Sequence, residues 1–310
     1  MKRFFLLASL FPFTLLAQDD SSIVEQPAAK QPDRSPAWIF AAPKIINTQS
    51  VEMIPKRTLA FNVTHNFGDI GGDNGGGKTF FGLDNATDVK IGFVYGLSNK
   101  VNIGLARAKG ASLVQQQLEF SLKYQLMSQS MDNHFPVSIT LYGNSVVSAT
   151  KRSPFPDQDN SFESFGSRFS HFFQVMFARR FGKLSLQLSP SVVTRSYVTS
   201  GDQSGVFALG GAVRLPIRRN FGLIMDYVHP FHSAGTKAFY RSQQLELYDV
   251  FGIGAEFITG GHVFHLNFTN ATEILENRMI PRTVTSWGKG QFRWGFTITR
   301  DFYFKKKKVS

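Results

Sequence analysis

Glu256 and His265 are the residues whose types and spacing come nearest to acid–base chemistry in this sequence. If Gly260-Gly261 forms a two-residue hairpin loop, Glu256 faces His265 across the two strands. A carboxylate beside an imidazole can move a proton. No nucleophile is identifiable beside the pair, so we expect one link in a polar network, and we predict no catalytic residue. Arg214 and Asp226 share a face of the preceding hairpin, and we predict that they form a diagonal ion pair.

Other enzyme signals are weak. The sequence lacks a G-x-S-x-G elbow, an H-E-x-x-H motif, a P-loop and a dinucleotide fingerprint, and its 310 residues contain no Cys. The acidic and Gly-rich stretch 69–77 lacks the Glu that completes an EF-hand loop, so we interpret it as a flexible loop. We therefore expect no metal site and no cofactor.

Three histidines, His65, His171 and His229, fall on the apolar parity of their segments. A lipase built on a barrel needs Ser, His and an acid near the rim of the lipid face. These histidines belong to segments that are not neighbours, so we interpret them as polar tips in the interfacial belt.

The segments that must position these residues alternate with period two, which is typical of strands with two different faces. From Val114 to Leu126, apolar side chains alternate with Gln, Glu, Ser and Lys, and no helical period fits. The first four predicted strands lie around 58–67, 89–97, 101–105 and 114–126. We place the other eight at about 135–150, 167–181, 184–199, 206–217, 221–231, 247–259, 262–270 and 291–304.

The connections between the predicted strands alternate in length. Those after strands two, four, six, eight and ten are short, and most of the others are long, with the connection around Lys109-Gly110 as the exception. Together with the even count, this predicts an all-β, antiparallel, up-and-down transmembrane barrel of about 12 strands, with short periplasmic turns and longer outer loops. Both termini would then be periplasmic.

The apolar parity should face lipid, and the polar parity should line the lumen. Charged side chains in mid-strand need partners or water, which a lumen supplies. The predicted lumen residues are Lys90, Glu119, Lys123, Arg168, Arg195, Arg214, Asp226, Glu256 and His265. The excess of basic over acidic groups among them predicts a modest preference for anions.

The two ends of the chain differ from the middle. Residues 1–17 are predicted to be a signal peptide, because Lys2 and Arg3 precede an apolar stretch that ends at Ala17. Residues 18–50 carry four prolines and are predicted to be an extended periplasmic segment, followed by the barrel at 51–304. The basic tail 305–310 includes Lys305 to Lys308 and contributes four charges to the formal net charge of +12. We expect no nucleic-acid partner for an exported protein.

An aromatic pair, Phe80-Phe81, lies in the first long loop and is followed by Gly82-Leu83-Asp84. Such a pair should be buried. One hypothesis is that residues 80–86 form a lid that constricts the barrel mouth, and the alternative is that they simply begin the second strand.

Several strings resemble an uncharacterised outer-membrane β-barrel family, domain of unknown function family 5777. They include His65-Asn66-Phe67-Gly68, the stretches 81–86 and 185–190, and 263–270, in consistent order over about 38–304. The family usually has Arg where this chain has Asn66. The resemblance implies an outer-membrane barrel without a settled activity.

These features predict an exported protein of the cell outer membrane that passes, binds or gates a small solute. Its expected partners are outer-membrane lipid, the barrel-assembly machinery and that solute. Three alternatives remain open: a closed barrel that recruits a partner protein of unknown identity, an outer-membrane hydrolase, and a soluble lipid-binding barrel whose apolar parity points inward.

Overall fold

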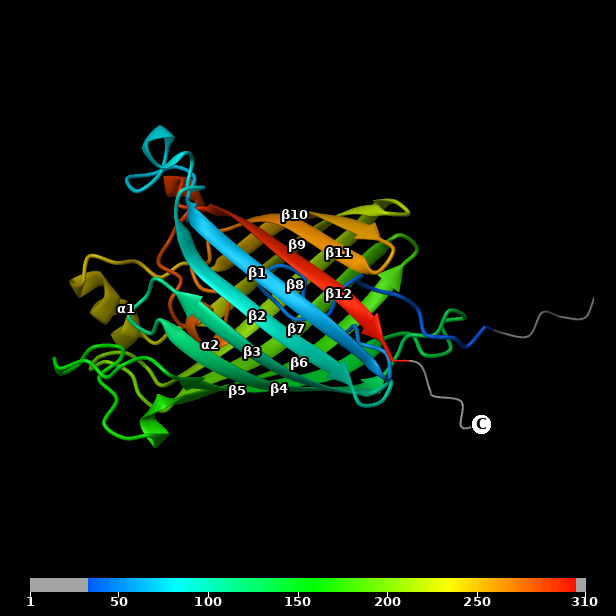
Figure 1. The fold of residues 1–310 in the computed structure, drawn as a ribbon, viewed down its shortest axis with the longest axis horizontal. Helices are drawn as coiled ribbons and strands as arrows, with labels where there is room; N and C mark the ends of the chain where they lie inside the picture. The colour runs from blue at the N-terminus through cyan, green and yellow to red at the C-terminus, as the bar shows by residue number, and fades with distance from the viewer. Residues whose placement is uncertain (1–32, 305–310) are drawn as a thin grey trace, which may run out of the picture. The chain divides into compact units, whose positions relative to one another are not determined.

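Twelve strands close into one antiparallel barrel in the computed structural model, which describes residues 33–304 (Figure 1). Each strand pairs with its neighbours in the sequence, and β1 pairs with β12 to complete the ring. The strands are β1 (Thr58–Asp69), β2 (Ala86–Gly96), β3 (Val101–Gly110), β4 (Gln116–Met127), β5 (Ser138–Ser148), β6 (Phe169–Phe181), β7 (Leu184–Arg195), β8 (Gly205–Arg218), β9 (Phe221–Phe231), β10 (Val250–Thr259), β11 (His262–Thr269) and β12 (Arg293–Tyr303). The predicted number of strands and the up-and-down order are confirmed.

Short helical pieces occur only in the connections of the described chain. They are α1 (Ala234–Ser242), α2 (Glu276–Met279) and the 3-10 turns η1 (Gly77–Thr79), η2 (Gly166–Arg168) and η3 (Trp287–Lys289). No helix among residues 33–304 is long and apolar enough to cross a membrane.

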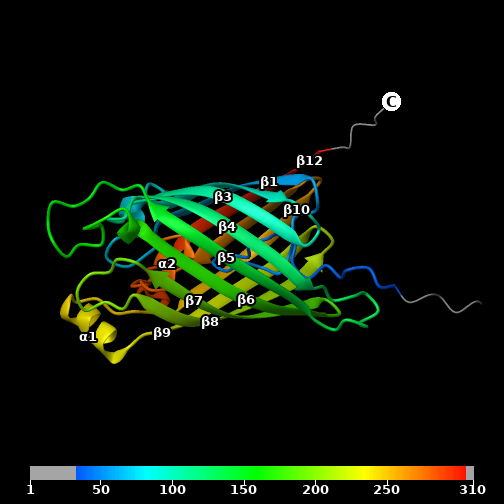
Figure 2. The same ribbon diagram turned by 90° about the horizontal axis from the view of Figure 1, so that it is seen from below.

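The two ends of the barrel differ as the connection lengths predict. The end with the connections 97–100, 128–137, 182–183, 219–220 and 260–261 is called the turn end, and the opposite end is called the loop end. The loop end carries four long connections, the intermediate 196–204 and the short 111–115. Residues 33 and 304, where the described chain starts and stops, both lie at the turn end (Figures 1 and 2).

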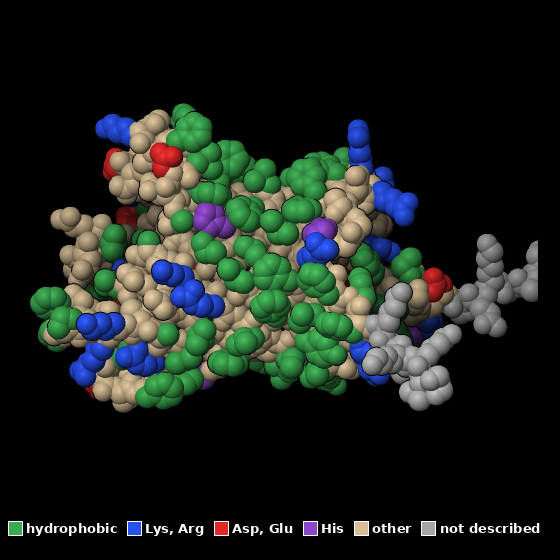
Figure 3. All heavy atoms as spheres, viewed as in Figure 1, with side chains coloured by type: hydrophobic (Ala, Val, Ile, Leu, Met, Phe, Trp, Pro, Cys, Tyr) green, Lys and Arg blue, Asp and Glu red, His purple; other side chains and the backbone are tan. Residues whose placement is uncertain are grey.

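Apolar side chains cover the outside of the barrel (Figure 3). Leu105, Phe120 and Leu122 are each at least half exposed, whereas Glu119 and Lys123 on the opposite parity of β4 are buried. The strands therefore present their apolar parity outward, as a membrane barrel requires and as a soluble lipid-binding barrel would not.

The prediction for residues 18–50 fails over the part that the structure describes. Residues 37–54, here called the N-terminal plug, enter the barrel at the turn end, reverse direction at Ile45–Thr48 and return to β1. Most of the plug is buried, and Ile39 and Ser50 are fully inaccessible. An extended segment can be buried here because the wall supplies partners for its backbone polar groups.

A second segment fills the lumen from the loop end. Residues 270–283, here called the loop plug, belong to the connection between β11 and β12 and include α2, all four residues of which are buried. This connection was predicted to be an outer loop, but over these residues it folds inward (Figure 2).

Candidate functional site

The inner wall of the barrel has two chemically different halves. The strands β5–β10, here called the core half, supply every wall residue of the main apolar cluster, including Phe172, Met176 and Ile224. The strands β1–β4, β11 and β12, here called the polar half, supply none of that cluster and carry buried Asn, Thr, Lys and Glu instead. The alternation predicted a polar interior all round; the core half does carry buried polar side chains, among them Gln187 and Asp226, but it adds the apolar cluster to them.

The N-terminal plug packs its apolar side chains into that same cluster. Ile39, Phe40, Ile45, Ile46 and Val51 are at most 3% exposed. Burial of one such side chain contributes about 1.5–3 kcal/mol, so the five together contribute roughly 10 kcal/mol. This part of the plug is a packed core.

Asp226 on β9 holds the tip of the plug. Its carboxylate accepts hydrogen bonds from the backbone N–H groups of Ile46 at 3.2 Å, Asn47 at 2.7 Å and Thr48 at 2.8 Å. The Asn47 side-chain amide donates a further bond at 2.8 Å. A fully buried carboxylate is stable only with such partners, and here the reversing backbone provides them.

Two charged side chains join the arms of the plug. Glu52 Oε1 accepts from the backbone N–H groups of Ile39 and Phe40, both at 2.9 Å. Lys123 Nζ on β4 donates to the carbonyl oxygens of Pro43 at 2.9 Å and Ser50 at 3.0 Å. Lys123, a predicted lumen residue, thus binds backbone of the plug.

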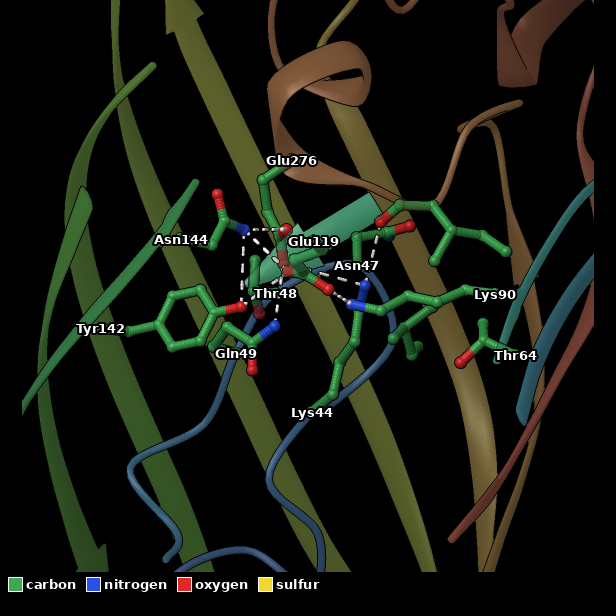
Figure 4. Close-up of polar contacts among 12 residues, drawn as sticks. Lys44, Asn47, Thr48, Gln49, Thr64, Lys90, Glu119, Tyr142, Asn144 and Glu276 are labelled. Carbon is green, nitrogen blue, oxygen red and sulfur yellow. Dashed lines mark hydrogen bonds and ion pairs between the residues drawn. The ribbon is translucent and has the colours of Figure 1, made fainter. Parts of the chain in front are cut away.

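The two plugs meet in the middle of the lumen at Glu276 of α2 (Figure 4). Glu276 Oε1 accepts from Gln49 Nε2 at 2.9 Å and lies 3.8 Å from Lys44 Nζ, while Oε2 accepts from Asn144 Nδ2 at 3.3 Å. Lys44 Nζ also donates to the Ile274 carbonyl at 3.0 Å. Displacement of either plug therefore breaks contacts of the other.

An ion pair between Lys90 and Glu119 lies beside this junction, and the Tyr142 hydroxyl donates to Glu119 at 2.9 Å. A cavity of about 70 Å³ lies beside the ion pair, between the N-terminal plug and the wall of the polar half. Its walls include Lys44, Lys123, Ser121 and the glycines Gly92 and Gly104. That volume holds roughly five water molecules.

The predicted hairpin register is confirmed. Glu256 pairs with His265 across β10 and β11, and His265 Nε2 lies 3.3 Å from Glu256 Oε2. Arg214 donates to the same carboxylate at 2.7 Å, and His265 Nδ1 lies 2.8 Å from the Ile45 carbonyl oxygen. The three side chains thus form a network that also touches the plug.

The predicted ion pair between Arg214 and Asp226 is wrong. Asp226 lies opposite Ala212, and Arg214 lies opposite Ile224. Each charge has a nearer partner: Arg214 binds Glu256, and Asp226 binds the backbone of the plug.

The remaining predicted lumen residues lie at the loop end. Arg195 pairs with Asp202 at 3.0 Å, and Arg168, in η2, donates to the carbonyl of Thr150 at 2.6 Å. The five predicted basic lumen residues therefore all bind protein groups in this closed form.

The lid hypothesis for the first loop is not supported by the positions of its residues. Phe80 and Phe81 are 62% and 54% exposed, and both have positive φ angles. Leu83 is also exposed, and Gly82 and Asp84 belong to the same projecting loop, which points away from the barrel (Figure 1). The loop plug occupies the mouth instead.

The histidines remain on separate strands, β1, β6 and β9. His229 Nδ1 lies 2.9 Å from Asp249 Oδ1, which gives a base and an acid on the outer face. Within residues 33–304 no serine hydroxyl is hydrogen-bonded to His229. Burial lowers the pKa of the nearby His232, which follows β9, to about 4, so that imidazole is neutral at pH 7.

Sequence reasoning missed Lys44, Gln49, Tyr142 and Glu276. One signal was available: Trp38 to Ala42 and Ile45-Ile46 are apolar runs in a segment that was expected to be solvated. The predicted signal peptide, residues 18–32 and the Lys305 to Lys308 tail lie outside the described residues.

Comparisons with known proteins agree with this architecture. An outer-membrane channel from Pseudomonas putida F1 matches with a TM-score of 0.50 at 12% identity, over 82% of this chain and 98% of that one. The KdgM porin has a TM-score of 0.48 at 8% identity, over 79% and 99%, and the NanC porin has 0.47 at 8%, over 80% and 100%. For the Pseudomonas putida channel, 12% identity shows a shared fold alone, and no curated protein matches the sequence. A family model for membrane-bound β-barrel domains matches residues 40–302, so the chain belongs to that family, DUF5777.

Proposed function

We propose that this protein is an outer-membrane channel for a small polar solute, held closed at rest by its own N-terminal plug and loop plug. In this proposal a signal peptide directs export and both termini are periplasmic, so the N-terminal plug enters from the periplasm. The observation that carries the proposal is the division of the lumen into a core half and a polar half.

The polar half has the properties of a path for solutes. Its contacts to the N-terminal plug are hydrogen bonds, such as those that Lys123 donates to the Pro43 carbonyl and Asn102 to the Ile54 carbonyl, which water can replace. The cavity beside Glu119 and Ser121 already separates plug from wall there. A modest rearrangement of the plug along this half would join the cavity to solvent without exposing the apolar cluster.

Closure at rest follows from the magnitude of the apolar contacts. Withdrawal of the whole plug would expose apolar side chains whose burial contributes about 10 kcal/mol. Each 1.4 kcal/mol lowers the population of the open form tenfold. Spontaneous withdrawal is therefore negligible. Opening requires a stimulus, such as a solute or partner that binds the open form better.

The test compares currents through planar bilayers for three proteins. The first is the mature chain, the second replaces residues 37–54 with a Gly/Ser linker of equal length, and the third also shortens 271–283. Heat-dependent gel mobility verifies that each variant has formed a barrel. We expect the mature chain to be silent and the third protein to give discrete steps, because both obstructions are gone.

The outcomes separate this proposal from its rivals. Silence from the third protein, once its barrel is verified, would contradict the channel and favour the closed barrel that recruits a partner. The hydrolase alternative rests on His229 and Asp249 alone. Ester hydrolysis by the mature chain that is lost in His229→Ala, with no current from any variant, would favour the hydrolase.

A further inference from the structure

Two basic side chains interrupt the apolar outer face of β3. Arg107 and Lys109 follow Ile103 and Leu105 on the same parity, and all four are exposed. A Lys or Arg facing lipid costs about 2–4 kcal/mol at the middle of a bilayer but only about 0–1 near its surface. Arg107 and Lys109 lie toward the loop end of β3, which is where the cost is small.

Neither side chain has a partner within the protein. In the part of the chain that the structure describes, Arg107 and Lys109 make no ion pair, side-chain hydrogen bond or cation–π contact. Outward arginines at the turn end behave differently: Arg179 lies 4.8 Å from the ring of Phe181, and Arg300 lies 5.1 Å from the ring of Phe302. The positive charges on β3 are thus free to bind a group from outside the chain.

A third basic residue lies close by along the wall. Lys109 pairs with Gln116, whose carbonyl accepts from the backbone N–H of Ala149. Adjacent strands are about 4.8 Å apart, so Ala149 is roughly 10 Å from Lys109 at the same level. Lys151, two residues further on, is exposed and has no carboxylate partner among residues 33–304. Figure 3 shows Lys and Arg side chains at both ends of the visible face, the loop end included.

We propose that Arg107, Lys109 and Lys151 form a binding surface for the phosphate groups of membrane lipids that surround the loop end. The apolar wall below them accommodates acyl chains, and the guanidinium and ammonium groups meet phosphate where the hydrocarbon ends. This surface lies outside the lumen, so the proposal goes beyond transport and does not depend on whether the barrel conducts.

The test measures lipid binding to the detergent-solubilised full chain by native mass spectrometry. Dioleoyl phosphatidic acid is titrated against dioleoylglycerol, which has the same acyl chains and no phosphate. The variant R107A/K109A/K151A, here called the wall variant, is compared with K78A/R152A/K237A, here called the loop variant. The loop variant removes three exposed charges from loop-end connections. Of these three residues, only Arg152 is next to the proposed surface.

We expect each removed charge to weaken phosphatidic acid binding about fivefold, so the Kd of the wall variant, which lacks three charges, should rise about a hundredfold. The Kd of the loop variant for phosphatidic acid should rise less. Dioleoylglycerol should bind all three proteins with the same affinity. Equal affinity of the wild type and the wall variant for phosphatidic acid would overturn the proposal. Displacement of the lipid by millimolar inorganic phosphate would show a site for free phosphate and would overturn the lipid assignment.

Discussion

Both halves of the lumen wall hold the N-terminal plug by hydrogen bonds, but the core half adds an apolar cluster that the polar half lacks. On β5–β10, wall residues such as Phe172 and Met176 belong to the same buried apolar cluster as Ile39 and Phe40 of the plug. On β1–β4, Lys90 and Glu119 pair with each other and border a cavity. One barrel wall thus has a side with a buried apolar cluster and a polar side that borders a cavity.

The difference shows where the plug is fixed and where it can change. Apolar packing has no substitute in water, whereas buried polar groups exchange protein partners for water at a small net cost. The core half should therefore determine whether the plug stays, and the polar half should determine how tightly the path beside it is closed. The predictions below test this division.

The largest effect is expected for Asp226→Ala. It leaves the buried N–H groups of Ile46, Asn47 and Thr48 without an acceptor, which should cost about 3–5 kcal/mol. The released tip should expose the Lys44–Ile45 bond to trypsin, and mass spectrometry of the fragments measures the cleavage. Asp249→Ala removes an exposed carboxylate at the loop end and is the control. Equal protection in both variants would show that the carboxylate does not hold the tip.

A cavity in the core half should have the next largest effect. Met176 is fully buried in the apolar cluster, so Met176→Ala should reduce the free energy of unfolding by about 2–5 kcal/mol. Met225 faces outward and is 37% exposed, and Met225→Ala should cost much less. Urea unfolding of the two variants in the same detergent makes the comparison. A similar loss in both would mean that the core half is not a packed core.

Much of the barrel could be predicted from the sequence because its rules are local. Alternation on β4, from Gln117 to Lys123, indicates both the strand and the direction of each side chain. The register between Glu256 and His265 followed from a two-residue turn, since the turn determines which residues face each other.

The occupied lumen could not be predicted in the same way because its contacts join distant parts of the chain. The plug has the prolines and polar residues of an extended segment, and its burial depends on Asp226, about 180 residues away. The same holds for Glu276, which meets Gln49 only after the barrel has closed. The alternation along a strand also does not show which apolar side chains face lipid and which face the plug inside the barrel.

The junction of the plugs should show coupling of intermediate size. Glu276→Gln keeps the shape of the side chain but removes the charge 3.8 Å from Lys44, and Lys44→Met removes the other charge. A double-mutant cycle on urea unfolding should give a coupling energy of about 1–2 kcal/mol, because both side chains are buried. The pair Lys289–Glu246, which is 60% exposed on both sides, is the control and should give less than about 1 kcal/mol. Additive effects at Glu276 and Lys44 would contradict a direct link between the plugs.

The smallest expected effect is a difference in the free energy of unfolding between two Thr→Val substitutions, one in each half of the wall. Thr297 Oγ1 bonds Thr64 Oγ1 at 3.1 Å and borders the cavity, so water can replace the hydroxyl that Thr297→Val removes. Thr140 Oγ1 donates to the Val51 carbonyl at 3.2 Å and is fully buried beside the core half. Thr140→Val leaves that carbonyl without a partner and should cost about 1–3 kcal/mol, whereas Thr297→Val should cost less than about 1 kcal/mol. Urea unfolding measures both, and equal costs or the reverse order would show that water does not replace the lost hydroxyl in the polar half.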